Sequence, residues 1–224
     1  MSRGKQRLRS LPSVVPEEGG AAKRPPATAR GLRRRATLIN AARVVFERDG
    51  YLDARLTDIT AQANCSTGSF YTYFDNKEEI FAAVLEAAKE DMLHPEVAHI
   101  TDNKNPYTVI EASNRAYFES YARNAKLMGL LEQVASIDPK FRQVRRRRSE
   151  EFSRRNARGI SRLQKQGVVD ADLDPLMASR ALSAMVSRLA FYTYVLEEPG
   201  TLEDLVFTTT RLWCNALNIP HPRS

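Results

Sequence analysis

Three similar helix-start signals constrain the fold of this chain more than any other feature. Asn105-Pro106, Asp138-Pro139 and Asp174-Pro175 each place a side chain that can cap free backbone N–H groups before a proline suited to the first helical position. Apolar residues recur at helical spacing, and no convincing strand alternation appears. The pattern predicts an all-α chain. Its expected C-terminal helices lie near 106–124, 126–135, 139–166, 175–197 and 201–217.

The N-terminal third predicts a compact unit of three helices followed by a connecting helix. The first helix should stop at Gly50, and Asn64 suits a sharp turn because asparagine tolerates the left-handed backbone conformation. Ser66 can cap the next helix, and Asn76 with a glutamate three residues later resembles a capping box. The expected helices cover about 33–49, 55–63, 67–73 and 77–93.

Positive charge is concentrated at the N-terminus. Residues 1–35 hold ten basic and two acidic residues, a charge of +8, so the remainder of this +7 chain carries −1. Residues 1–31 also have few large apolar side chains, which predicts a disordered basic arm attracted to polyanions. Nucleic acid is the first candidate partner, and an anionic membrane surface is the second.

Several function classes lack their sequence signals. Cys65 and Cys214 are far apart, and His94 and His99 have no thiols or carboxylates arranged around them, so we expect neither a disulfide nor a metal site. The chain shows no phosphate-cradling glycine loop, no nucleophile elbow, no signal peptide and no membrane-spanning apolar run. We therefore expect a cytoplasmic, non-enzymatic protein without a cofactor and without a membrane partner.

The stretch from Leu56 to Phe74 has the layout of a helix-turn-helix, in which a short scaffold helix holds a second helix in the DNA major groove. Together with its surroundings, about 33–85, it resembles the DNA-binding domain of TetR-type regulators. The positions that carry the resemblance are Leu38, Ile39, Ala42, Phe46, Gly50, Tyr51, Ile59, Ala63, Ser66, Thr67, Gly68, Ser69, Phe70, Tyr71, Thr72, Tyr73, Phe74 and Lys77.

The resemblance implies that the recognition helix begins at Ser66, that Thr72 faces the bases, and that Lys77 pairs with a phosphate. Phe70 and Phe74 are expected in the core. The residues expected to contact DNA are Arg33, Arg34, Arg55, Ser66, Thr67, Gly68, Ser69, Tyr71, Thr72, Tyr73 and Lys77.

Two positions depart from the usual pattern of the family. Asn64-Cys65 stands where Gly-Val is common; a small buried apolar role for Cys65 is favoured over a redox-sensing thiol. Arg55 replaces the usual hydroxyl cap of the second helix, so Asp53 is expected to cap that helix and to leave Arg55 free to reach a phosphate.

The C-terminal part resembles the family only in its helix plan, which implies a ligand pocket and a dimer interface formed by the last two helices. The expected pocket residues are Tyr117, Phe118, Tyr121, Met128, Leu131, Phe152 and Phe191. The expected interface residues are Ala181, Leu182, Met185, Leu189, Leu205, Leu212 and Trp213. Packing within one subunit is the alternative for both sets.

An arginine run occupies the long helix expected at 139–166. The favoured interpretation is a solvated helix face balanced by Glu150 and Glu151. The run consists of Arg145 to Arg148, with Arg154, Arg155 and Arg158. The alternative is a site for the phosphates of an acyl-coenzyme A or a similar anion.

The sequence as a whole predicts a DNA-binding domain over 32–80 and a ligand-binding and dimerisation domain over 81–224. The expected function is a homodimeric repressor that leaves a near-palindromic double-stranded DNA operator when a small lipophilic or amphipathic effector binds. A transcriptional activator or a constitutive DNA-binding protein of the same fold is the alternative. The helix at about 77–93 would link the two domains.

Overall fold

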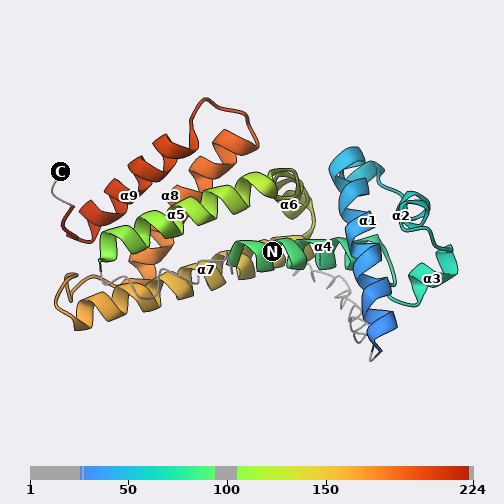
Figure 1. Cartoon of the computed structure of the whole chain (residues 1–224), viewed down its shortest axis with the longest axis horizontal. Helices are drawn as coiled ribbons and strands as arrows, with labels where there is room; N and C mark the ends of the chain where they lie inside the picture. Colours follow the sequence, from blue (N-terminus) through green and yellow to red (C-terminus); the bar gives the residue numbers. More distant parts are fainter. Residues whose placement is uncertain (1–25, 27, 94–104, 222–224) are drawn as a thin grey trace, which may run out of the picture.

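The computed structural model describes residues 26, 28–93 and 105–221, and this part of the chain is built from helices with no strand (Figure 1). The predicted all-α class is confirmed. His94, His99 and nearly all of the expected basic arm lie outside the described residues. The helices are α1 (Ala29–Asp53), α2 (Leu56–Gln62), α3 (Thr67–Tyr71), α4 (Lys77–Leu93), α5 (Pro106–Arg123), α6 (Ala125–Ile137), α7 (Pro139–Lys165), α8 (Pro175–Tyr194) and α9 (Leu202–Ala216).

The predicted helix starts are confirmed by their caps. Asn105 Oδ1 accepts from the N–H of Tyr107 at 3.0 Å, and Asp138 Oδ1 accepts from the N–H of Lys140 at 2.7 Å. The side chain of Asp174 caps α8 in the same way. These local bonds satisfy backbone donors that have no partner inside the helix, which is why short sequence signals located the helix starts well.

Helix α1 and the start of α2 differ from the sequence prediction. Gly50 interrupts α1 with φ 79° and ψ 173°, as expected for the end of a helix, but a further helical turn follows as far as Asp53. Arg55 is the N-cap residue of α2 and makes no side-chain cap. The expectation that Asp53 caps α2 is wrong, because Asp53 belongs to the turn that closes α1.

Helices α1, α2 and α3 lie together at one end of the molecule, and α4 leads from them to α5–α9 (Figure 1). An aromatic cluster joins the two parts at the base of α4. The ring of Phe81 on α4 lies 4.8 Å from that of Phe46 on α1 and 5.2 Å from that of Phe141 on α7. Because these rings are almost completely buried, α4 is packed between the N-terminal helices and α7.

None of the described helices combines the length and apolar character needed to cross a membrane.

Candidate DNA interface and ligand cavity

The turn between α2 and α3 is held from both sides. Asn64 adopts a positive φ of 49°, as the sequence predicted, and its carbonyl oxygen accepts from Arg34 Nη2 of α1 at 3.2 Å. The N–H of Cys65 donates to the carbonyl of Thr60 at 3.0 Å, and the Cys65 side chain is half-buried against the core. These contacts fit the small apolar role predicted for Cys65, and they give Arg34 a structural bond.

Helix α3 presents one apolar and one polar face. Phe70 and Phe74 are fully buried, which confirms their predicted place in the core. Ser66 caps the helix, its Oγ accepting from the N–H of Ser69 at 3.2 Å. The solvent-facing residues of this segment are Ser66, Thr67, Gly68, Tyr71 and Thr72. Of the residues 66–73 that are expected at DNA, only Ser69 and Tyr73 are half-buried.

The basic residues around α3 differ in what they contact. Arg33 and Arg55 are exposed. Lys77 instead donates from Nζ to the carbonyl oxygens of Tyr51, Leu52 and Ala54, at 2.8, 3.0 and 3.1 Å. Its ammonium group thereby binds the end of α1, so a phosphate would have to replace at least one of these hydrogen bonds.

Polar contacts connect the last turns of α4 to the junction of α5 and α6. Asn124 Nδ2 donates to Asp91 Oδ2 at 2.8 Å, and Arg123 Nη2 donates to Asp91 Oδ1 at 3.2 Å. Arg43 of α1 donates from Nη2 to the backbone carbonyl of Arg123 at 3.0 Å. Helices α1 and α4 thus share the same anchoring point on the C-terminal helices.

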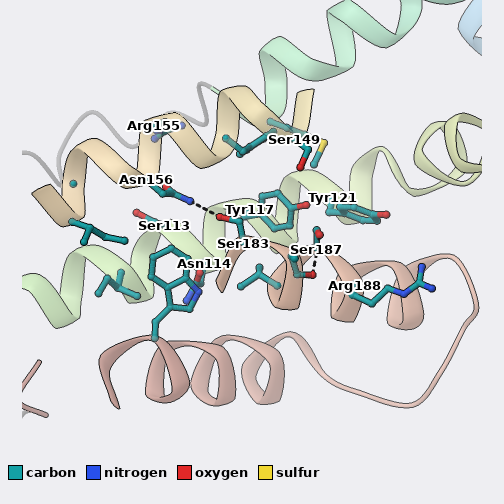
Figure 2. Close-up of a pocket in the computed structure, with 18 of the residues that line it drawn as sticks. Ser113, Asn114, Tyr117, Tyr121, Ser149, Arg155, Asn156, Ser183, Ser187 and Arg188 are labelled. Atoms are coloured by element: carbon teal, nitrogen blue, oxygen red, sulfur yellow. Dashed lines mark hydrogen bonds between the residues drawn. The ribbon is translucent and has the colours of Figure 1, made fainter. Parts of the chain in front are cut away.

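A cavity of about 720 Å³ lies between α5, α7 and α8 and is closed by residues of α4, α6 and α9 (Figure 2). Phe118 is fully buried elsewhere in the core and does not line it, because its position on α5 faces the protein interior. The other residues expected in the pocket all line the cavity: Tyr117, Tyr121, Met128, Leu131, Phe152 and Phe191.

Polar groups interrupt the apolar lining. Asn156 of α7 donates to Ser183 Oγ of α8 at 3.0 Å across the cavity wall (Figure 2). Asn114 donates to Thr210 Oγ1 at 3.2 Å. The indole N–H of Trp213 is buried and has no hydrogen-bond partner among the described residues. Sequence reasoning did not identify this polar set, since small polar residues carry no periodic signal that separates a cavity wall from a packed core.

The charged residues that line the cavity are mostly basic. Five arginines line the cavity against a single acidic residue, Glu132, which already accepts from Arg145 Nε at 2.6 Å. Arg148 is half-buried, and burial lowers the pKa of its guanidinium. Arg145, Arg148, Phe152 and Arg155 follow one another at helical spacing, which was the signal that could have separated these three arginines from the rest of the run. The five arginines are Arg145, Arg148, Arg155, Arg162 and Arg188.

The residues expected at a dimer interface divide into two groups. Leu205 and Trp213 are each only 7% exposed within the single chain, because α9 packs against α5 and Trp213 reaches the cavity. Leu212 is 44% exposed, and Phe207, which sequence reasoning missed, is 61% exposed on the same helix. Of the α8 residues in the set, Ala181 is exposed, while three are half-buried: Leu182, Met185 and Leu189.

Comparison with known proteins gives matches at both the sequence and the fold level. Residues 38–84 match the family model described as bacterial regulatory proteins, tetR family. The Escherichia coli transposon Tn10 TetC protein is 26% identical over 101 residues, which is 45% of this chain and 51% of that protein. An uncharacterised HTH-type transcriptional regulator of Bacillus subtilis is 31% identical over 61 residues, 27% of this chain and 30% of that protein. These alignments therefore span about half of the first relative and less than a third of the second.

The fold is shared over a longer region. The crystal structure of a TetR-family transcriptional regulator from Syntrophomonas wolfei superimposes with a TM-score of 0.71 at 22% identity, covering 82% of this chain and 95% of that one. The match to the tetR family model therefore falls on α1–α4, and the resemblance that extends through the C-terminal helices is one of fold.

Proposed function

We propose that this protein is a ligand-responsive, DNA-binding transcriptional repressor that acts as a homodimer in the cytoplasm. The observation that carries the proposal is the combination, in one chain, of an exposed helix-turn-helix at one end and a large, partly open cavity at the other. The proposed domains are residues 32–80 for DNA binding and 81–224 for the ligand and the dimer contact.

The DNA surface would be formed by the exposed side of α3 and its basic neighbours. Thr67, Tyr71 and Thr72 can reach bases or phosphates in a major groove, and Arg33 and Arg55 are free to approach the phosphate backbone. Arg34 and Lys77 support this surface through their bonds to the turn and to α1, respectively.

A second subunit would cover the outer face of α8 and α9. Phe207 and Leu212 are large apolar side chains left in solvent on α9, and Ala181 leaves room for close helix approach on α8. A two-fold arrangement of this kind presents two copies of α3 to half-sites about one DNA turn apart, which predicts a near-palindromic operator.

The ligand response would operate through α4. Met92 at its C-terminal end lines the cavity, while Phe81 near its N-terminal end packs on α1. A ligand that favours a different position of Met92 would tilt α4 and change the distance between the two recognition helices. Activation of transcription, or constitutive binding, would use the same surfaces.

The test is retention of genomic DNA fragments, starting with the region upstream of the protein's own gene, across a salt series with nonspecific competitor. The wild-type protein is expected to retain a near-palindromic site selectively. Thr72→Ala should lose at least tenfold in affinity with unchanged thermal stability, because Thr72 is exposed. Gln143→Ala, at an exposed position of α7, is the matched control. Equal, salt-sensitive retention of all fragments would show only nonspecific charge attraction and would contradict the proposal.

A further inference from the structure

We propose that the cavity is specific for an organic anion, a carboxylate or phosphate group on an apolar body, and that Arg148 binds the charged group. This inference rests on the proposed function in that it names the class of effector for the cavity. It is carried by the charge lining the cavity and by two polar groups without suitable partners.

Arg148 is a cation that lacks a counterion. Its guanidinium Nη2 contacts the sulfur of Met92, which is a weak acceptor, and no carboxylate of the described residues lies within ion-pair distance. The nearby acids Glu86 and Glu151 both bind Lys89, at 2.5 and 3.2 Å. A half-buried guanidinium without an anionic partner is unfavourable, so an anionic ligand would satisfy it.

The surroundings of Arg148 disfavour a positively charged ligand. Glu132, the single acidic lining residue, is already paired with Arg145, so a cationic ligand would meet several arginines and no free carboxylate. Tyr117 and Tyr121 line the same region, and burial raises the pKa of both phenols, which keeps them neutral. The site is therefore positive at neutral pH.

Trp213 provides a second recognition point. It is 93% buried, lines the cavity, and its Nε1–H has no acceptor among the described residues. An unsatisfied buried donor favours a ligand that brings an acceptor atom, such as a carbonyl or ether oxygen.

The extent of the cavity lining along α5 favours an elongated ligand body. The lining on α5 runs from Pro106 to Tyr121, which is about 22 Å at a rise of about 1.5 Å per residue. Apolar and aromatic side chains such as Val109, Ile110 and Phe152 form much of the lining. A chain or an extended ring system, with one charged end, fits this lining better than a compact polar molecule.

The experiment uses Trp213 itself as the reporter, because it is the single tryptophan of the chain. The full-length protein is titrated with four ligands of eight carbon atoms each: octanoate, octyl phosphate, 1-octanol and octylammonium. Both anions are expected to change the tryptophan emission with a Kd at least tenfold below those of the alcohol and the amine. The tighter of the two anions identifies the preferred head group.

Arg148→Met should remove the preference for anions while changing the affinity for 1-octanol less than twofold. Arg147→Met is the matched control, since it removes the same charge from the adjacent, exposed position outside the cavity. Equal or tighter binding of octanol or octylammonium, no binding of either anion, or a preference that survives in Arg148→Met would overturn the inference. If Arg148→Met does not fold, as judged by circular dichroism, the ligand series on the wild-type protein decides alone.

Retention of DNA fragments in the absence of any ligand is measured in parallel for the wild type and both variants. Selective DNA retention without an anion preference would reject only the inference. If the wild-type protein retains no DNA fragment selectively, the proposed function is rejected, whatever the cavity binds.

Discussion

Asn124 donates its buried amide to Asp91 Oδ2 across 2.8 Å, and this bond ties the junction of α5 and α6 to the end of α4. The same carboxylate also accepts from Arg123, whose carbonyl oxygen in turn binds Arg43 of α1. Asp91 is therefore the point at which the connecting helix and the C-terminal helices are held together.

Asp91→Ala should lower the free energy of unfolding by about 1–2 kcal/mol, since it removes one acceptor from a buried amide that retains a bond to the carbonyl of Ser120. For a chain of this size that corresponds to a midpoint about 2–8 °C lower in thermal unfolding. Glu119→Ala, an exposed acid on α5, is the control and should change the midpoint little. An unchanged midpoint in Asp91→Ala would show that these bonds do not stabilise the junction.

Lys77→Met should destabilise the protein by about 1–3 kcal/mol, because it removes a charged donor from three carbonyl groups at the end of α1. Lys140→Met, at an exposed position, is the control for loss of a lysine charge. Urea unfolding measures the stability, and the salt dependence of DNA binding separates the two roles. A purely structural lysine leaves that slope unchanged, whereas a lysine that contacts a phosphate reduces it by about 1.

Phe207→Glu should convert the proposed dimer into monomers, since it places a carboxylate in the middle of an apolar contact on α9. Sedimentation velocity measures the oligomeric state. Leu52, which is also largely exposed, lies in the turn that follows Gly50. Leu52→Glu is therefore the control and should leave the dimer intact. A wild-type monomer at micromolar concentration would contradict the proposed dimer. A dimer that survives both Phe207→Glu and Leu212→Glu would place the interface elsewhere.

Alkaline pH should destabilise the fold. Burial raises the pKa of the Cys214 thiol to about 11, and burial also raises the pKa of the Tyr51, Tyr117 and Tyr121 phenols. Above pH of about 8.5 the unfolded chain begins to lose the Cys214 proton while the folded chain keeps it, so the free energy of unfolding falls as the pH rises toward 11. Urea titrations between pH 7 and pH 10.5 measure this trend.

The same burial protects Cys214 from alkylation. At pH 8 iodoacetamide should label it far more slowly in the native protein than in urea, where both cysteines react at the rate of free thiols. Mass spectrometry of the labelled peptides distinguishes Cys214 from the half-buried Cys65. Rapid native labelling of Cys214 would contradict the burial seen in the structure.

Local sequence determined the positions of the helices and of the helix-turn-helix in this protein. The Asn-Pro and Asp-Pro pairs marked helix starts, Gly50 marked a break and Asn64 marked a turn, because caps and positive φ values depend on residues only a few positions apart. The match of Ser66 to Phe74 to a known motif then placed helix α3, whose cap at Ser66 is local but whose Phe70 is held by packing in the core.

Tertiary structure alone decided what each helix face covers. Helical spacing put Trp213 and Leu212 on apolar stripes of α9, but only the packing of α9 against α5 turns Trp213 into the cavity and leaves Leu212 in solvent. Tertiary packing likewise places Phe118 of α5 in the core and not at the cavity. Arg148 was one of a run of arginines in the sequence, and it differs from them because the fold places it beside Met92, without a carboxylate to neutralise it. Periodicity defines which residues share a face, whereas the neighbour of that face depends on contacts between distant segments.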